Sequence, residues 1–287
     1  MKFDVVIGNP PYQDPIATSS KKLWDKFVLK GIEHTNKNGF LAMITPSSWM
    51  GGQSEVFELM KDKQPLVFCP DGSQHFPNVG TTISYYIIKN CKNTLPTITT
   101  NGSMIDFKSV SFIPKSCNKN AISILEKVIS TDKLDVNYDS FCHSQRQDKV
   151  RKKQDGEFIY PNKHGSNTLL YSNVKHPAMD LQKVMFYMSG RMKPFYDNGE
   201  HGISQHHGYV PVNNKIEADN LIKYLRSKII SFLIQESTFA QAWNKKFIKT
   251  IPMIDLSKSW TDSELYQHFN LTQEEIDYIE QTVKYGA

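Results

Sequence analysis

The residues with the clearest potential for chemistry stand near the N-terminus, in the tetrapeptide Asn9-Pro10-Pro11-Tyr12. Two successive prolines cannot continue a helix or an inner strand, so the sequence predicts a rigid loop here. The Asn9 side chain and the Pro10 main chain each offer a carbonyl oxygen as acceptor, and Tyr12 offers a flat aromatic face. Two acceptors held in fixed positions can bind both hydrogens of one amino group and localise the lone pair of its nitrogen.

The elements around this loop must hold it in place. The apolar, β-branched run at residues 3–7 ends at Gly8 and predicts a buried parallel strand. In open α/β sheets, ligands bind beyond the carboxyl ends of the strands, which is where this strand places the loop. Apolar residues recur at helical spacing from Leu23 to Ile32 and predict a helix that Gly39 ends.

Strands and helices continue to alternate up to residue 89. The sequence predicts strands at residues 40–44, 65–68 and 82–89, with a helix at residues 54–60. This order indicates an α/β fold with a wound sheet and a late hairpin.

The composition of the sequence changes after residue 90. A stretch rich in Thr, Pro and Asn at residues 94–101 indicates a domain boundary. The pattern beyond it predicts an extended piece at residues 111–115 and several short β-like pieces within residues 135–210. It also predicts four helices: at residues 121–129, at residues 218–235, after Thr261 and after Thr272.

Composition sets broad limits on the class of protein. The chain has 287 residues, of which 39% are hydrophobic and 22% charged, as in ordinary soluble globular proteins. Its net charge of +5 is compatible with a polyanionic partner but does not establish one. No apolar run approaches the roughly 20 residues that a membrane span needs, and the N-terminus has no signal-peptide pattern. We therefore expect a cytoplasmic protein without a membrane partner.

The sequence predicts no metal site. The four cysteines form no CxxC pair and are expected to be reduced thiols; they are Cys69, Cys91, Cys117 and Cys142. His201, His206 and His207 lie close together in the sequence, but no carboxylate or cysteine completes a tight ligand pattern with them.

Residues 4–12, Asp-Val-Val-Ile-Gly-Asn-Pro-Pro-Tyr, resemble motif IV of the amino-group methyltransferases, whose core is Asp/Asn/Ser-Pro-Pro-Tyr/Phe. The resemblance implies transfer of a methyl group from S-adenosylmethionine to N6 of an adenine that is flipped out of DNA. Asn9 and Pro10 then orient and activate the amine, Pro11 stiffens the loop, and Tyr12 stacks on the base. The methyl group passes directly to nitrogen without a covalent enzyme intermediate.

Later segments extend the resemblance to adenine methylases of restriction–modification systems. Residues 39–49 are similar to the family's next strand and the loop after it, and residues 76–84 to a later motif in which an aromatic residue contacts the flipped base. Phe76 is accordingly the candidate for a second aromatic residue that stacks on the flipped base. The alternative is that Phe76 is an ordinary phenylalanine of the hydrophobic core. The closing segments after Trp260 and Leu271 also resemble the C-terminal ends of such methylases.

The implied fold is α/β, the C-terminal half of a Rossmann-like methyltransferase sheet followed by a mixed α+β target-recognition region. Residues 1–95 are expected to be the catalytic subdomain, residues 96–215 the target-recognition and DNA-binding region, and residues 216–287 a C-terminal helical region.

The chain departs from the family at the cofactor. The glycine-rich turn that holds S-adenosylmethionine is expected before motif IV, where only eight residues stand, or after the recognition region. Glycines there are scattered among polar residues without an apolar strand before them: Gly190, Gly199, Gly202 and Gly208. The chain is therefore expected to need a partner subunit that supplies the cofactor lobe, to be a fragment, or to be a silent DNA-binding remnant.

A basic cluster marks the presumed recognition region. It consists of Arg146, Lys149, Arg151, Lys152 and Lys153, which can neutralise phosphates of double-stranded DNA, although a solvated loop is the plain alternative. Six polar residues are candidates for reading base edges: Gln145, Asn162, Asn167, Gln205, His206 and His207. No nuclease pattern is evident in the sequence.

Two other functions stay open. The same loop serves methyltransferases that act on RNA bases or on a glutamine side chain of a protein. The chain can also be a non-catalytic DNA-binding or assembly subunit of a restriction–modification system. The long basic, aromatic-bearing C-terminal region favours nucleic acid as the substrate.

Overall fold

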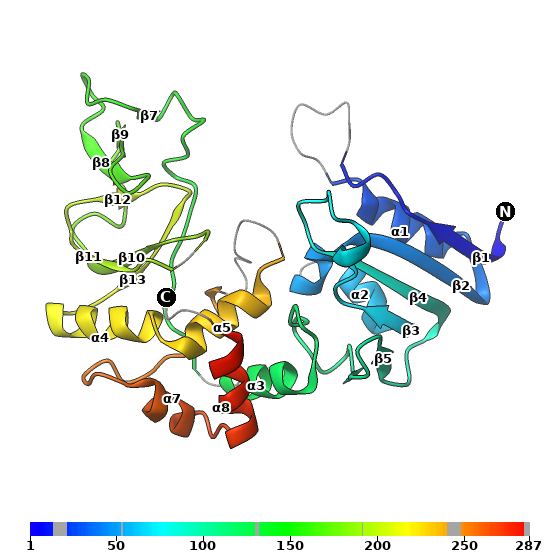
Figure 1. Ribbon diagram of the computed structural model, residues 1–287. Helices are drawn as coiled ribbons and strands as arrows, with labels where there is room; N and C mark the ends of the chain where they lie inside the picture. The colour runs from blue at the N-terminus through cyan, green and yellow to red at the C-terminus, as the bar shows by residue number, and fades with distance from the viewer. Residues whose placement is uncertain (14–21, 53, 130–131, 191, 240–247, 284–287) are drawn as a thin grey trace. The chain divides into compact units, whose positions relative to one another are not determined.

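A six-stranded mixed sheet carries the N-terminal tetrapeptide. In the computed structural model its strand order is β1-β2-β4-β3-β5-β6, with β1 at one end, as Figure 1 shows. β1 runs parallel to β2, whereas β4 is antiparallel to its neighbours β2 and β3. The bounds are Phe3–Gly8 for β1, Thr35–Pro46 for β2, Lys63–Cys69 for β3, Ile83–Lys92 for β4, Thr97–Thr99 for β5 and Met104–Ile105 for β6.

The structure describes residues 1–13, 22–52, 54–129, 132–190, 192–239 and 248–283. The chain divides into two compact units. Unit 1 consists of residues 1–125 and 235–240 and contains the sheet; unit 2 consists of residues 126–234 and 241–287.

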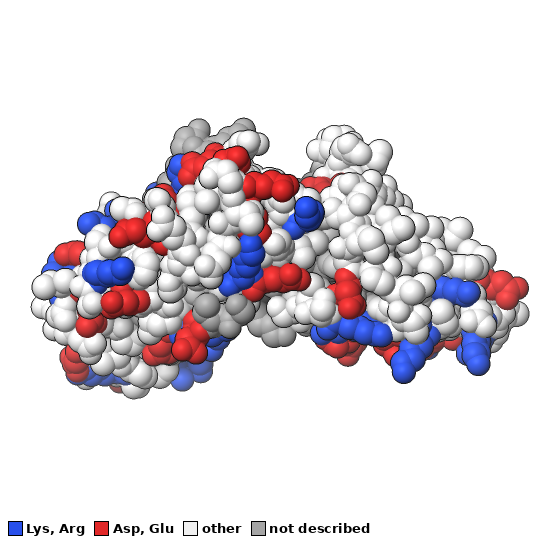
Figure 2. All heavy atoms as spheres, turned by 90° about the horizontal axis from the view of Figure 1, so that it is seen from below, with Lys and Arg blue, Asp and Glu red and all other residues white. Residues whose placement is uncertain are grey.

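On the face drawn in Figure 2, acidic and basic side chains are interspersed over unit 2, at the left, whereas a broad area of unit 1 carries none.

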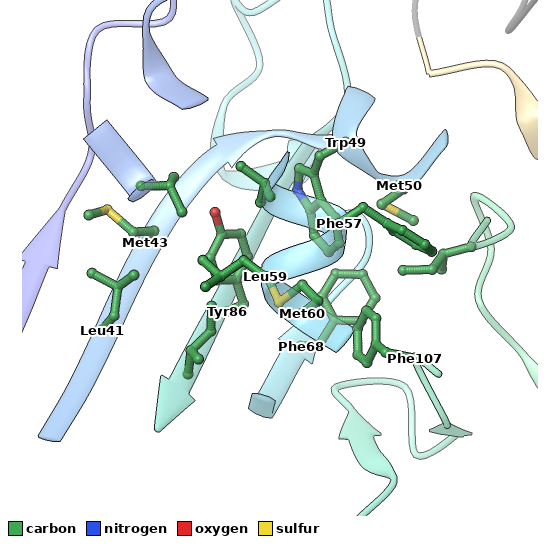
Figure 3. Close-up of a cluster of buried hydrophobic side chains, with 14 of the residues drawn as sticks. Leu41, Met43, Trp49, Met50, Phe57, Leu59, Met60, Phe68, Tyr86 and Phe107 are labelled. Carbon is green, nitrogen blue, oxygen red and sulfur yellow. The ribbon is translucent and has the colours of Figure 1, made fainter. Parts of the chain in front are cut away.

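One face of the sheet in unit 1 is covered by helices. α1 (Trp24–Glu33) connects the parallel strands β1 and β2, and α2 (Glu55–Asp62) connects β2 to β3. The apolar stripes of both helices pack with inward side chains of β2 and β4 into one core, part of which Figure 3 shows. At its centre Trp49 is fully buried, and its ring lies 5.4 Å from Phe68 and 5.5 Å from Tyr86 between centroids.

The opposite face of the sheet remains open in the part of the chain that the structure describes. Side chains alternate along each strand, so residues next to the buried ones point to this second face. Val5 and Ile7 of β1 are 53% and 79% exposed, and Phe40 of β2 and Ile87 of β4 are also exposed. Unit 1 therefore presents an apolar sheet face, which we call the open face, next to the free edge of β1.

Most elements predicted for unit 1 are confirmed. The prediction that the strand at residues 3–7 is buried is wrong, because Phe3, Val5 and Ile7 of β1 are 47%, 53% and 79% exposed. The helix that Gly39 was expected to end also stops earlier. α1 ends at Glu33, and β2 begins at Thr35, so Gly39 lies within a strand. A Cβ at this position would meet the main-chain oxygen of Asp4 at 2.7 Å. Gly39 thus allows the close approach of β1 and β2. The predicted extended piece at residues 111–115 forms no strand.

Unit 2 holds two small sheets and most of the C-terminal helices. One sheet has the order β11-β10-β13 and the other β12-β8-β9-β7. The strands are β7 (Val150–Arg151), β8 (Tyr160–Lys163), β9 (Leu169–Ser172), β10 (Gln182–Tyr187), β11 (Phe195–Asn198), β12 (Gly202–Ile203) and β13 (His207–Pro211). Among the residues that the structure describes, the remaining α-helices are α3 (Lys119–Ile129), α4 (Lys215–Leu225), α5 (Lys228–Ser237), α7 (Asp262–His268) and α8 (Gln273–Thr282).

Two predictions for these helices have different outcomes. The capping boxes are confirmed, because the Thr261 and Thr272 side chains accept from the main chains of Glu264 and Glu275. The single helix predicted at residues 218–235 is wrong, since α4 ends before Arg226 and α5 begins at Lys228. The predicted end of α8 near Lys284 lies outside the described residues.

The boundary between units differs from the predicted segments. Ile105, Phe107 and Ile113 pack into the core of unit 1, so this unit extends well past residue 95. After residue 215, residues 216–234 and 241–287 belong to the same unit as the small sheets, and only residues 235–240 return to unit 1. The architecture is mixed α/β. Among the described residues, no helix is both long enough and apolar enough to span a membrane.

Candidate active site

The tetrapeptide follows directly on the last residue of β1, at the carboxyl end of the strand. Asn9 is exposed and Pro10 is buried. Within the described part of the chain, no hydrogen bond occupies the Asn9 amide or the Pro10 carbonyl oxygen. Both acceptors that the sequence singled out are therefore without a hydrogen bond to a described residue, and the Asn9 side chain is also accessible.

A pocket of about 610 Å³ brings Asn9 and Phe76 together. Ile7 pairs with Ala42 of β2, which pairs with Ile87 of β4, and this row of open-face residues lines the pocket. Asn9 lines it from beyond β1, and Phe76 comes from the loop before β4. An amide and an aromatic ring thus border an apolar site at the carboxyl end of β1.

Several hydrogen bonds hold the loop that carries Phe76. The main-chain N–H of Phe76 donates to the Ser73 carbonyl oxygen at 2.8 Å. The Ser73 hydroxyl accepts from the main chain of Ile83 at 3.1 Å, and the Gly72 N–H donates to the Ile83 carbonyl oxygen at 2.7 Å. These bonds tie the loop to the first residue of β4, so Phe76 is positioned from the sheet although it lies outside a strand.

Buried polar groups fix the neighbouring end of β2. The Trp49 indole N–H donates to the Ser84 hydroxyl at 3.0 Å, and this hydroxyl donates to the Thr45 carbonyl oxygen at 3.4 Å. The main-chain N–H of Ser47 donates to the Thr82 carbonyl oxygen at 2.8 Å. The carboxyl end of β2 and the start of β4, which flank the pocket, are therefore held by paired groups with no solvent access.

Tyr12 lies outside the residues that line the pocket with Phe76. Its side chain is half-buried and packs against the core of unit 1, and this burial raises the pKa of its hydroxyl. Its carbonyl oxygen accepts from the main chain of Leu23 at 3.3 Å. The predicted pair of stacking residues thus divides: Phe76 borders the pocket with Asn9, while Tyr12 lies beside the start of α1.

A second pocket of about 550 Å³ flanks the tetrapeptide on the side of β1 and α1. Asn9, Pro10 and Pro11 line it together with apolar residues of both elements. Lys30 and His34 are the polar side chains at its margin beyond Asn9, and its lining includes no described carboxylate. The tetrapeptide therefore stands between two pockets, one over the open face and one at the outer end of the sheet.

The predicted basic cluster lies in unit 2. Its five residues occupy the turn before β7, β7 itself and the residues after it. The Lys149 ammonium lies 5.5 Å from the centroid of the Phe141 ring, and the Arg151 guanidinium lies 4.3 Å from that of Phe158. The other three, Arg146, Lys152 and Lys153, are exposed.

The structure restricts the residues predicted to read base edges. Asn162 is fully buried and His207 is 1% exposed, so neither can contact DNA in this conformation. Burial, followed by the neighbouring His206, His164 and Lys163, lowers the pKa of His207 to about 4. Gln145, Asn167 and His206 are exposed, and Gln205 is half-buried.

Two residues of the Phe76 pocket escaped the sequence-based prediction. His75 and Tyr85 line it together with Asn9. The Cys69 thiol beside Tyr85 and its partial burial raise the pKa of that hydroxyl. The alternation in residues 82–89 could have assigned Tyr85 to the same face as Ile87, whereas nothing local marks His75.

Comparison with known proteins agrees with the resemblance in the first part of the chain. Residues 1–68 match the family described as Eco57I restriction-modification methylase. A Mycoplasma pneumoniae protein described as an uncharacterised adenine-specific methylase is 44% identical over 68 residues, which is 22% of this chain and 16% of that protein. The chain thus spans about a sixth of the length of this curated relative.

Two solved structures are similar over most of the chain, each at 10% identity. The type IIG restriction endonuclease BpuSI matches with a TM-score of 0.36 over 97% of this chain and 49% of its own. The type IIL restriction-modification enzyme MmeI, solved in complex with DNA, matches with a TM-score of 0.45 over 97% of this chain and 54% of its own. This chain spans about half of each of these longer chains.

Proposed function

We propose that this chain supplies the amine-activating and DNA-recognising parts of an S-adenosylmethionine-dependent DNA adenine-N6 methyltransferase. The observation that carries the proposal is the pocket at the carboxyl end of β1 that Asn9, whose side-chain oxygen has no hydrogen bond to a described residue, lines together with Phe76. The match of residues 1–68 to a methylase family supports the same chemistry.

The chemistry of the site follows from its acceptors. An adenine amine is a poor nucleophile because its lone pair is delocalised into the ring. The Asn9 side-chain oxygen accepts one of its hydrogens and the Pro10 carbonyl oxygen accepts the other, which favours a tetrahedral nitrogen with a localised lone pair. Because the prolines fix the loop, these acceptors are in place before the base arrives.

The substrate must leave its duplex to reach this site. Asn9 lies at the end of a strand beside a pocket, where a stacked base inside a helix cannot enter, so the proposal includes base flipping. The apolar row of Ile7, Ala42 and Ile87 gives the pocket a floor, and Phe76 offers a ring on which a flipped adenine can stack. Tyr12 contributes a second ring only if its side chain leaves its contact with the core.

The described residues around the tetrapeptide do not fit S-adenosylmethionine by themselves. The cofactor supplies the methyl group and carries ribose hydroxyls, an adenine and an amino-acid end. The pocket between β1 and α1 is mainly apolar and has no described carboxylate for the ribose hydroxyls. The proposed cofactor lobe therefore comes from elsewhere, and the described residues hold the target base.

The free edge of β1 and the open face are the proposed place for that lobe. Parallel strands are normally covered on both faces, and an unpaired edge favours addition of another strand. Val5 and Ile7 are more than half exposed on this strand, although they belong to an apolar run. We expect the cofactor lobe to add a strand beside β1 and to cover the open face outside the pocket that receives the base.

Replacing Val5 with Lys tests the exposed edge in the isolated chain. The chain alone is expected to self-associate through its apolar edge, and a lysine there is expected to weaken this association about 10- to 150-fold, because a buried valine contributes roughly 1.5–3 kcal/mol. Sedimentation velocity over a concentration series gives the dissociation constants. Ile216→Lys is the control, since Ile216 is 69% exposed on α4 in unit 2. Equal association of Val5→Lys and the unchanged chain contradicts the prediction.

Cofactor binding tests the proposed division of labour. Isothermal titration calorimetry of the isolated chain with S-adenosylmethionine is expected to show no measurable heat of binding. Transfer of a labelled methyl group is expected only when a cofactor-binding polypeptide is added, tested first with the product of the neighbouring gene. Tight binding by the chain alone refutes the division. Labelling of RNA or of a protein glutamine in place of DNA identifies one of the alternative substrates.

A further inference from the structure

A polar groove in unit 2 lies beside the predicted basic cluster. It has a volume of about 790 Å³ and is bordered by β7, β9, the turn before β7 and the turn between β8 and β9. We infer that this β7–β9 groove binds the sugar–phosphate backbone of duplex DNA, which rests on the proposed function. The residues that carry the inference are Gln147, Arg151, Lys152, His164, Asn167 and Tyr171.

The charge at the groove is unbalanced. Residues 146–153 contain five basic side chains and one acidic side chain, Asp148. None of the five basic side chains forms an ion pair with another described residue. Arg151 and Lys152 stand directly in the lining of the groove. Positive charge left without a carboxylate beside a cavity attracts an anion, and phosphates are the anions that DNA offers.

The two walls of the groove are held in place by specific contacts. Arg151 of β7 pairs with Tyr171 of β9, and its guanidinium lies over the Phe158 ring. On the turn before β7, the Ser144 N–H donates to the Gln205 side-chain oxygen at 3.1 Å, while the Gln205 amide donates to the Ser144 hydroxyl at 2.8 Å. Gln205 therefore positions this turn through both ends of its amide, which leaves it poorly placed to read a base.

Neutral polar groups complete the lining. His164 lies with Nδ1 3.1 Å from the Ser204 hydroxyl oxygen, and burial together with the nearby His206 lowers its pKa. The lowered pKa favours the neutral imidazole, which can donate or accept one hydrogen bond. Gln147 and Asn167 add amide groups on the two sides of the groove. Such neutral donors beside fixed cations suit the phosphate and sugar oxygens of a DNA strand.

The salt dependence of DNA binding tests the inference. Fluorescence anisotropy of the full chain with a labelled duplex gives the association constant at several NaCl concentrations. Lys152→Gln removes an exposed charge that lines the groove, so the slope of log K against log [salt] is expected to fall in magnitude by about 0.9. Between about 50 and about 200 mM NaCl, the variant then loses about 3.5-fold less affinity than the unchanged chain. Arg151→Gln is expected to have the same effect on the slope.

Lys215→Gln is the matched control, because Lys215 is an exposed lysine of unit 2 that pairs with Asp219 on α4. Its slope is expected to equal that of the unchanged chain, and circular dichroism checks that all variants fold. Slopes of Lys152→Gln and Arg151→Gln that equal that of the unchanged chain overturn the inference. So does a slope of Lys215→Gln that falls as much as those of the groove variants, or a fall in slope that is seen only with single-stranded DNA. Absence of duplex DNA binding by the unchanged chain also overturns it.

Failure of the groove can be separated from failure of the proposed function. If the chain transfers methyl groups to DNA but the groove variants have unchanged slopes, the β7–β9 groove does not bind DNA and the proposed function still holds. If both groove variants have lower slopes but no condition gives methyl transfer, the β7–β9 groove binds DNA and the proposed function is wrong.

Discussion

With the proposed function, Asn9→Ala is expected to lower the rate of methyl transfer to duplex DNA by about 100- to 1,000-fold, the usual cost of removing one fixed hydrogen-bonding group that stabilises a transition state. The alanine side chain cannot accept a hydrogen from the amine, so only the Pro10 carbonyl oxygen remains to localise the lone pair. The measurement is transfer of a labelled methyl group in the reconstituted enzyme. Most of the loss is expected in kcat, because the apolar floor of the pocket and Phe76 still receive the base.

Two controls separate chemistry from binding. Asn9→Asp keeps an oxygen acceptor at the same place and is expected to retain a large part of the activity that Asn9→Ala loses. Retention of duplex DNA is expected to be nearly the same in all three proteins, since Asn9 lies in unit 1 and the basic cluster in unit 2. Near-full turnover by Asn9→Ala would show that the tetrapeptide does not activate the amine.

Trp49→Ala destabilises unit 1 by about 3–5 kcal/mol, the range measured for removing a large buried aromatic side chain. Trp49 is fully buried, and its ring contacts Phe68, Tyr86 and Phe107. The substitution also removes the indole N–H that donates to Ser84, which leaves a buried hydroxyl with one partner fewer. The cost therefore has a packing part and a polar part.

Urea unfolding followed by far-ultraviolet circular dichroism measures the effect. Because the chain has two compact units, the loss is expected in one transition, with the other unchanged. Trp260→Ala is the control: this tryptophan is half-buried in unit 2, and its loss is expected to cost much less. A destabilisation below about 1 kcal/mol for Trp49→Ala would contradict its central place in the core.

The parts of the fold that the sequence predicted well depend on local patterns. The apolar run before Gly8 and the two prolines after Asn9 define β1 and its loop without help from distant residues. The capping boxes at Thr261 and Thr272 are also local, since each joins residues three positions apart. Such signals survive folding because nothing elsewhere in the chain competes with them.

Other features depend on pairing across long stretches of sequence. Phe76 borders the pocket with Asn9 because β4 pairs with β2, which pairs with β1; local pattern does not give this order. Gly39 was expected to end a helix, yet it lies in a strand where a Cβ would meet Asp4. Asn162 and His207 have side chains suited to base edges, and only the packing of unit 2 shows that both are buried.

The open face of unit 1 has a thermodynamic consequence. A polypeptide that covers Val5, Ile7 and Phe40 removes apolar surface from water, so its association carries a negative heat-capacity change, which calorimetry at several temperatures can measure. Any such polypeptide binds the folded sheet and not the unfolded chain. The melting temperature of unit 1 should then rise with the concentration of its partner, by mass action alone. Assembly and folding of this sheet are in this way one linked equilibrium.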